Sequence, residues 1–277
     1  MIARRRFLAT ILAFAASPAW GKGARLVIKG AMEQGSLALG YAEPGASATV
    51  NGEKVRISPD GVFAFGFAYD QAKPSIVAVT WKDGSTETQS YTPTARQYEI
   101  QRVNGLPQET VTPPPAVLAR IRHEAENIYL ARQRDTAGDD DFLSGFDWPA
   151  PGIESGVFGS QRIDNGVAMA PHFGVDMAAP TGTPIHAPAN GIVTISDDYY
   201  LDGGFTLIDH GQGVSTCYLH QSKRLVKVGD RVKRGQLIGR IGQTGRATGP
   251  HLHWAMNWFE VKLDPSRSTR TPKPAPL

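Results

Sequence analysis

The chain carries at residues 249–254 the stretch Gly249-Pro250-His251-Leu252-His253-Trp254, which has the pattern of a β-strand. Side chains alternate between the two faces of a strand, so His251 and His253 point the same way and Leu252 faces the opposite side, as a core residue would. Two imidazoles on one face are a start for zinc, which takes histidine nitrogen and carboxylate oxygen in tetrahedral sites. Taken alone, the pattern also fits two hydrogen-bonded surface histidines.

Two upstream segments supply the remaining groups of a metal site. The first is His172-x-x-x-Asp176, where neighbouring prolines and Gly174 argue against a helix and favour an extended chain. The second is Tyr218-Leu219-His220, which is strand-like in its context. A catalytic zinc typically keeps three protein ligands and leaves one position for water. The set of one carboxylate and four histidines therefore leaves histidines free to act as general base and oxyanion stabiliser.

The motifs stand in the order of a known family. From Phe158 to about Trp254 the sequence resembles the catalytic domain of the lysostaphin-type (LytM-like) zinc metallopeptidases. The shared motifs are, in chain order, His172-x-x-x-Asp176, Gly182-Thr183-Pro184-Ile185, Ala187-Pro188-Ala189-Asn190-Gly191, Tyr218-Leu219-His220, Val226 to Val232, Gly235 to Gly239, and Gly242 to His253. The resemblance covers somewhat under half of the chain, and no ligand position is substituted.

This resemblance implies a role for each of the five residues. His172, Asp176 and His253 match the zinc ligands of the family. His220 and His251 match the two catalytic histidines beside the metal. Members hydrolyse peptide bonds in peptidoglycan across a groove on an antiparallel β-sheet, with a zinc-bound water whose pKa falls to as little as about 7. How the two catalytic histidines divide proton transfer and oxyanion stabilisation stays open.

Other polar residues of this region are predicted to have no part in the chemistry. His210 and His186 are interpreted as structural, and Cys217 as a small core residue in preference to a fourth zinc ligand. Three acids are interpreted as solvated loop residues: Asp197, Asp198 and Asp202.

The predicted fold class is mainly β. Residues 22–110 contain short β-rich runs separated by turn pairs such as Asn51-Gly52, which predicts an immunoglobulin-like β-sandwich with no chemical constellation of its own. Residues 111–147 are a proline-rich linker with a helix from about Ala116 to Gln133. Residues 148–265 are the antiparallel β-sheet peptidase domain, and residues 266–277 are a disordered tail. The helix presents Leu118 and its apolar neighbours on one stripe, which leaves Glu124 on a solvated face.

Residues 1–21 are predicted to be an export signal, because three arginines precede an apolar run and a small-residue stretch. Arg4-Arg5-Arg6-Phe7-Leu8 also resembles the twin-arginine motif, and a Sec signal is the alternative. The protein is then exported, to the periplasm or otherwise outside the cell.

Without this segment the 29 Lys and Arg residues become 26, which equals the 26 Asp and Glu, so charge gives no reason to expect nucleic acid. With Cys217 as the one cysteine, neither an internal disulfide nor a lipid anchor near residue 20 is expected, and no later segment is apolar enough for a membrane anchor.

The sequence thus predicts a zinc-dependent endopeptidase, with one Zn²⁺ per chain, acting on peptidoglycan peptide stems. The alternatives are a non-catalytic module that binds peptidoglycan or activates an amidase, and a zinc phosphoesterase, which would need further metal ligands. A further hypothesis is intramolecular occlusion of the groove by residues 22–147. Whether a D-alanyl–diaminopimelate bond or a glycine bridge is cleaved is left open.

Overall fold

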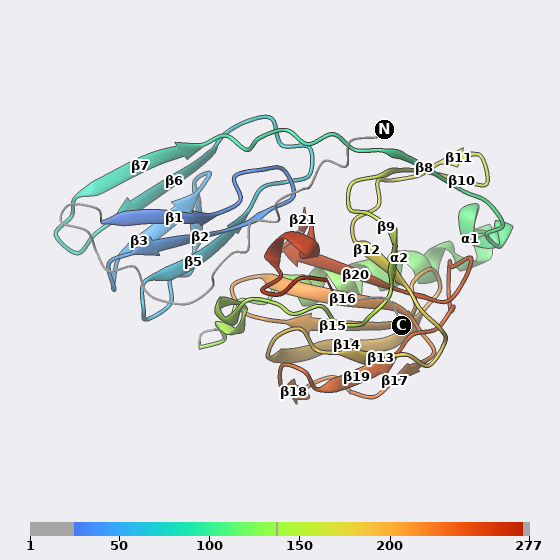
Figure 1. Ribbon diagram of the computed structural model, residues 1–277. Coiled ribbons are helices and arrows are strands. Elements are labelled where there is room, and N and C mark those ends of the chain that lie inside the picture. The colour runs from blue at the N-terminus through green and yellow to red at the C-terminus, as the bar shows by residue number, and fades with distance from the viewer. Residues whose placement is uncertain (1–24, 137, 274–277) are drawn as a thin grey trace, which may run out of the picture.

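The computed structural model describes residues 25–136 and 138–273, so the predicted export signal lies outside the described residues. The described chain is mainly β, as predicted (Figure 1). The N-terminal strands are β1 (Leu26–Gly30), β2 (Leu37–Ala42), β3 (Ser47–Val50), β4 (Glu53–Val55), β5 (Val62–Gly66), β6 (Ser75–Thr80) and β7 (Thr86–Tyr91). There follow β8 (Ile100–Val103), α1 (Gln108–Val111), α2 (Pro115–Arg132) and the 3₁₀ helix η1 (Asp141–Ser144). The C-terminal elements are β9 (Ile153–Gly156), β10 (Gln161–Asp164), β11 (Val167–Ala168), β12 (Val175–Ala178), β13 (Pro184–His186), β14 (Gly191–Tyr199), β15 (Gly203–Asp209), β16 (Val214–Gln221), β17 (Lys223–Arg224), β18 (Arg231–Val232), β19 (Leu237–Arg240), β20 (His251–Trp258), β21 (Val261–Leu263) and the 3₁₀ helix η2 (Pro265–Ser268).

The N-terminal strands form a small β-sandwich. Its two antiparallel sheets have the orders β1-β2-β5 and β4-β3-β6-β7 (Figure 1). They bury a common core that includes Phe63, Phe65 and Val77. The β3–β4 hairpin turns at Asn51 and Gly52, whose φ values of 53° and 86° lie in the left-handed region that this residue pair tolerates. The sandwich prediction is confirmed, and its assignment to the immunoglobulin-like type stays a prediction.

The C-terminal part is built on an eight-stranded antiparallel sheet in the order β18-β14-β15-β16-β20-β12-β9, with β21 paired to β20. A second, small sheet of order β13-β19-β17 lies beside it. Leu252, Trp254 and Met256 of β20 point into the main hydrophobic core and are fully buried. The alternate positions of β20 face away from that core, which places His251 and His253 on the opposite face of the sheet, as the alternation predicts.

The two parts of the chain are joined more closely than the predicted boundary at residue 110 implies. β8 pairs in parallel with β10, so it belongs to the C-terminal part and not to the sandwich. Leu37 and Leu39 of β2 pack into the main core together with Trp254. The predicted accessory domain of residues 22–110 therefore includes a strand of the C-terminal part. The sequence did not reveal this, because a strand pairing that spans about sixty residues leaves no local signature.

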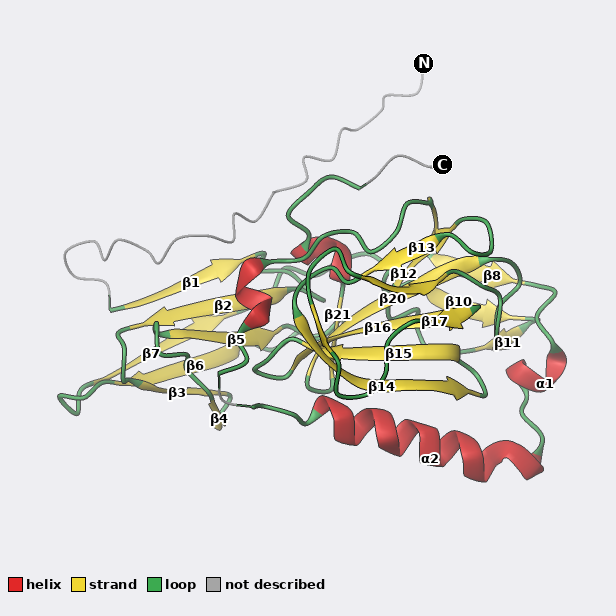
Figure 2. Cartoon of the chain, turned by 90° about the horizontal axis from the view of Figure 1, so that it is seen from below, coloured by secondary structure: helices red, strands yellow, loops and turns green. Residues whose placement is uncertain are grey.

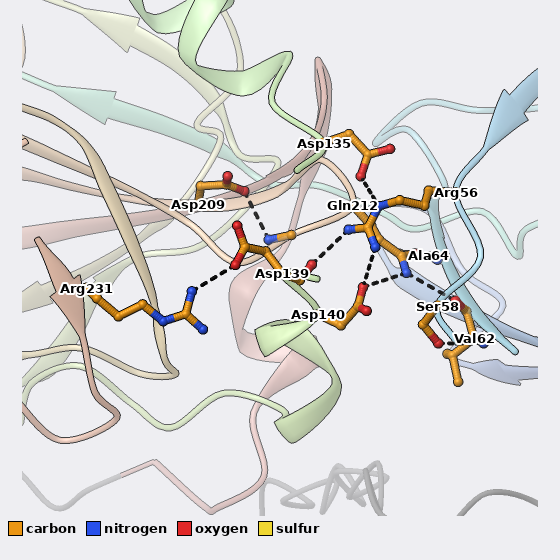
Figure 3. A network of polar contacts seen from close by, with 11 residues as sticks. Arg56, Ser58, Val62, Ala64, Asp135, Asp139, Asp140, Asp209, Gln212 and Arg231 are labelled. Carbon is orange, nitrogen blue, oxygen red and sulfur yellow. Dashed lines mark hydrogen bonds and ion pairs between the residues drawn. The ribbon is translucent and has the colours of Figure 1, made fainter. Parts of the chain in front are cut away.

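A polar network also crosses this junction (Figure 3). The side-chain Oε1 of Gln212 accepts a hydrogen bond from the Ala64 N–H at 2.9 Å, and its Nε2 donates to the Val62 carbonyl at 3.1 Å. The same Nε2 donates to Asp140 Oδ1 at 2.9 Å, and Arg56 donates to that carboxylate oxygen at 3.0 Å. The network gives the buried Ala64 N–H an acceptor and the Val62 carbonyl, which also accepts from the Ser58 N–H at 2.7 Å, a second donor.

Helix α2 matches the predicted span but packs on a different face. It lies along β14 and β15 (Figure 2). Leu118 is 38% exposed, whereas Glu124 is buried, accepting hydrogen bonds from the Tyr200 N–H at 2.9 Å and from Arg120 Nε at 2.6 Å. The solvated-face prediction for Glu124 is therefore wrong, because the loop after β14 presents a backbone donor that needs an acceptor. No helix in the described residues is long and apolar enough to cross a membrane.

The predicted disorder of the tail is wrong for residues 266–273. Asp264 caps η2 by accepting a hydrogen bond from the Ser266 N–H at 3.0 Å. The Arg270 N–H donates to the Phe146 carbonyl at 2.8 Å, and its guanidinium lies 3.1 Å from Asp147. Long-range contacts thus hold a segment whose composition alone indicates disorder. Residues 274–277 lie outside the described residues.

Candidate metal centre

Three donor atoms meet at one point on the face of the main sheet that points away from the main core, here called the open face. His172 Nε2 lies 3.0 Å from Asp176 Oδ1 and 2.8 Å from His253 Nδ1, and the latter two atoms are 2.8 Å apart. Bond lengths of roughly 2.0–2.2 Å to a tetrahedral zinc place its donors roughly 3.4 Å apart, so a slight widening of this cluster accommodates the ion. Two histidine nitrogens and a carboxylate oxygen are also the donor types that zinc takes in catalytic sites.

The backbone explains why residues so distant in sequence meet. Asp176 on β12 and His253 on β20 are direct cross-strand partners. Two glycines allow the close approach of the strands to these side chains. A Cβ at Gly156 would lie 2.3 Å from Asp176 Oδ2, and one at Gly174 would lie 2.5 Å from His253 Nε2. Either contact would displace a ligand, so a glycine is required at both positions.

Further contacts hold two of the donors in orientation. His172 Nδ1 lies 3.1 Å from the Val157 carbonyl, which accepts its N–H and leaves Nε2 unprotonated for a metal. Arg162 Nη2 lies 2.6 Å from Asp176 Oδ2, which leaves Oδ1 directed at the centre. Sequence reasoning missed Arg162, because an isolated arginine fourteen residues before its partner follows no pattern.

The protonation states suit metal binding. Burial alone would raise the pKa of Asp176, but the adjacent His172 and His253 outweigh it and hold the pKa well below its usual range. Burial lowers the pKa of His253 to about 4, although the hydrogen bond to the Asp176 carboxylate acts in the opposite direction. At neutral pH the aspartate is therefore ionised and His253 is neutral, which are the forms that bind a cation.

His220 and His251 lie next to these donors. Their ring centroids are 4.7 Å apart, and His251 Nε2 lies 3.9 Å from Asp176 Oδ1. His220 Nδ1 contacts the Thr244 carbonyl at 2.8 Å and His251 Nδ1 contacts the Gly249 carbonyl at 2.9 Å, so each ring is oriented through Nδ1. Burial, then the neighbouring His251 and His253, hold the pKa of His220 well below its usual range. Both Nε2 atoms are thereby left to interact with a substrate.

The structure thus brings together all five residues singled out from the sequence, while their division into ligands and catalytic groups stays a prediction. Cys217 is buried on the same sheet, outside the donor cluster. His210 is fully buried between the Asn190 carbonyl at 2.6 Å and Thr216 Oγ1 at 2.8 Å, in keeping with a structural role, and burial lowers its pKa to about 4.

The interpretation of three aspartates as solvated loop acids needs correction. Asp197 and Asp198 are exposed, but they lie in strand β14, where Arg224 pairs with Asp198 at 2.5 Å. Asp202 is half-buried, and burial raises its pKa to about 6. The turn that contains Asp202 is covered by other elements, which local composition does not reveal.

Two hollows flank the centre on the open face of the sheet. One, of about 400 Å³, is lined by Asp176, His251 and three arginines, of which Arg102 comes from β8. The other, of about 360 Å³, is lined by His253, Phe173 and side chains of α2. The donor cluster therefore lies between two recesses that are large enough to hold parts of a peptide.

Comparison with known proteins agrees with this geometry. The model of peptidase family M23 matches residues 170–265, a segment that contains the three donors and both neighbouring histidines. Residues 170–265 form an M23 peptidase domain. The resemblance to the lysostaphin-type peptidases is thereby confirmed.

Relatives with assigned activities match about a third of this chain. The peptidoglycan DD-endopeptidase ShyA of Vibrio cholerae is 48% identical over 88 residues, which are 32% of this chain and 20% of ShyA. The DD-carboxypeptidase/endopeptidase Mpg of Neisseria meningitidis is 45% identical over 83 residues, which are 30% of this chain and 19% of Mpg. The chain spans about one fifth of the length of these curated relatives.

A solved structure extends the similarity beyond the M23 domain. A crystal structure of a candidate M23 peptidase from Pseudomonas aeruginosa has a TM-score of 0.66 and 28% sequence identity, and the match covers 86% of this chain and 96% of that one. The arrangement of the sandwich on the peptidase domain therefore recurs in a second protein.

Proposed function

We propose that the protein is a zinc-dependent endopeptidase that hydrolyses peptide cross-links in peptidoglycan. The observation that carries the proposal is the meeting of His172 Nε2, Asp176 Oδ1 and His253 Nδ1 at distances of 2.8–3.0 Å, beside two oriented histidines. The substrate class is supported by ShyA, which is named a peptidoglycan DD-endopeptidase. A non-catalytic module would have no need of a complete set of metal donors, so the enzyme is favoured over that alternative.

The reaction would use the chain's own residues in three ways. His172, Asp176 and His253 would hold a zinc ion, which supplies Lewis-acid polarisation and a water of lowered pKa when bound. With Nδ1 of His220 and His251 held by carbonyl groups, each Nε2 is an unprotonated acceptor that can take a proton from the attacking water. Once protonated, the same nitrogens can return the proton to the leaving amine or donate a hydrogen bond to the oxyanion.

The test separates metal binding from catalysis. The purified protein should bind one zinc per chain and reduce the turbidity of purified sacculi. His172→Ala should lose the metal, whereas His251→Ala should keep it and lose at least about 100-fold in rate, the usual scale for a general acid–base group. Full activity in His251→Ala, or no bound metal after reconstitution, would overturn the proposal.

Two further assays decide between the alternatives and identify the bond. Sacculus digestion that requires an added amidase would favour the activator, and hydrolysis of generic phosphodiesters would favour the phosphoesterase. Mass spectrometry of the released muropeptides distinguishes a D-alanyl–diaminopimelate bond from a glycine bridge.

We also propose that residues 1–21 direct export and that the protein acts in the periplasm. The arrangement of arginines, apolar residues and small residues in the first 21 positions supports this. N-terminal sequencing of the protein from periplasmic extracts should find a new terminus near Ala19 or Gly21, and retention of Met1 would contradict the proposal.

Occlusion by residues 22–147 is a further proposal, which rests on the walls of the two hollows. α2 contributes Tyr129 and Arg132 to one hollow, and β8 contributes Arg102 to the other. A fragment of residues 148–277 is a poor test, since it would lose the β8 pairing and expose the core. Tyr129→Ala in the full chain should instead speed sacculus digestion, and an unchanged rate would contradict occlusion by α2.

A further inference from the structure

The hollow between α2 and the open face of the main sheet, here called the α2 pocket, adjoins the metal centre through His253. Its volume is about 360 Å³, and Phe173, Leu219 and Ile128 contribute to its apolar wall. Phe173 directly follows the donor His172. A substrate bound at the metal centre would therefore place an adjacent side chain in this pocket.

The pocket contains two side chains of opposite charge, Asp202 and Lys262, that do not pair with each other. Asp202 and Lys262 both line it, and in residues 25–136 and 138–273 neither side chain forms a hydrogen bond or an ion pair within 4 Å. Arg132, 10% exposed, has contacts at 3.8 Å to Glu260 and at 3.6 Å to Cys217 Sγ, and its Nε has no partner. Charges held in a pocket without partners raise the free energy of the fold, unless a ligand supplies the counter-charges.

The pKa values of the two groups reflect this cost. Burial raises the pKa of Asp202 to about 6, and burial lowers the pKa of Lys262 to about 8. Both groups remain ionised near pH 7, but each is displaced towards its neutral form. A ligand that brings an ammonium group to Asp202 and a carboxylate to Lys262 would recover this cost.

We propose that the α2 pocket binds the free α-amino-acid end of a diamino dicarboxylic acid residue in the substrate. Its ammonium group would meet Asp202, its carboxylate would meet Lys262 and Arg132, and its methylene chain would lie along the apolar wall. The inference rests on the proposed endopeptidase function and adds to it the chemistry of the recognised side chain. A lysine side chain would satisfy only Asp202, and a glycine bridge would satisfy neither charge.

The experiment compares two cross-linked peptides that differ at one residue of the donor stem, which is either diaminopimelate or lysine. The side-chain amine of this residue is not acylated in the cross-link, so its end is free. With the full-length, zinc-loaded protein, the diaminopimelate peptide should be hydrolysed with a kcat/KM about 10–100-fold higher, the discrimination expected from a charge-assisted contact. The difference should lie mainly in KM, since the contact binds a group that does not react. Lys262→Met should reduce the preference to below about 3-fold.

The matched control is Lys223→Met, which removes an exposed lysine on β17 and should keep the full preference. A preference that persists in Lys262→Met, or equal rates on both peptides, would overturn the inference while leaving the endopeptidase intact. If neither peptide is hydrolysed, the proposed function fails, and binding of free diaminopimelate then decides the inference by itself. A rise in Tm with diaminopimelate but not with 1,5-diaminopentane, which has no carboxylate, supports the pocket if it is absent in Asp202→Asn, and no such rise contradicts it.

Discussion

Asp202→Asn tests the electrostatics of the α2 pocket without altering the five residues of the metal centre. The substitution keeps the shape of the side chain and removes its charge. Because the ionised carboxylate is half-buried without a partner in the described residues, we expect the variant to be more stable than the wild type near neutral pH. The substitution is predicted to stabilise the fold and to weaken the preference for the diaminopimelate peptide. Such a loss of function on stabilisation is common where binding groups are held at a cost to stability.

The magnitude follows from the shift of the Asp202 pKa. The pKa lies at about 6 in the folded protein against an ordinary value of 3.8. A difference of this size corresponds to about 3 kcal/mol, because one pH unit is worth about 1.4 kcal/mol. Asp202 is partly exposed, so solvent screening reduces the effect, and we expect the variant to gain about 1–3 kcal/mol of unfolding free energy.

The sign of the pH dependence is fixed by the direction of the shift. Below the unfolded-state pKa of 3.8 the carboxyl is neutral in both states and has no electrostatic cost. As the pH rises from 3.8 to about 6, the unfolded chain ionises first and the folded state loses stability. Above this window the cost is constant, so the advantage of the asparagine should grow between pH 4 and pH 6 and then level off.

The assay is urea denaturation of metal-free wild type and variant, followed by circular dichroism between pH 4 and pH 8. Metal-free samples are used because bound zinc would add its own stabilisation. Groups that titrate elsewhere in the chain cancel in the difference between the two proteins. A difference that does not depend on pH, or a variant less stable than the wild type at pH 8, would refute the reasoning.

Three further predictions concern the centre, the junction and a buried histidine. Gly156→Ala should weaken zinc affinity at least about 10-fold in a competitive chelator titration, because the added Cβ would lie 2.3 Å from Asp176 Oδ2. Unchanged affinity would contradict this, since it would mean that the strand shifts and leaves Asp176 in place. Gln212→Ala should cost about 2–4 kcal/mol in urea unfolding, because it removes three hydrogen bonds around β5, and a loss below about 0.5 kcal/mol would mean that water replaces them. Burial lowers the pKa of His210 to about 4, so the ring should stay neutral in NMR titrations from pH 8 down to pH 5. The unfolding free energy should fall as the pH drops from 6.5 towards 4, because the unfolded chain takes up the proton first. A ring that protonates near pH 6.5 would contradict this.

Local patterns account for what could be predicted from the sequence. The alternation of His251, Leu252 and His253 indicates a strand with one core face, and the structure bears this out in β20. The Asn51-Gly52 pair predicts its hairpin for a similar reason, since its left-handed backbone is a property of the residues themselves. The five residues of the centre could be identified from the sequence because they lie in short motifs that recur in a known family.

Tertiary contacts account for what could not be predicted. Arg162 holds Asp176, and Glu124 accepts from the backbone of Tyr200, which lies 76 positions further along the chain. Such pairs depend on which strands and helices pack together. The sequence around a charged residue does not show whether its side chain contacts water or a buried hydrogen-bond donor. The sequence by itself thus determined the metal-binding motif and the β-strand character of the chain. Only the tertiary structure decided that β8 pairs with β10 of the C-terminal part and that Asp202 and Lys262 share a pocket beside the centre, because burial and long-range pairing are properties of the packed chain.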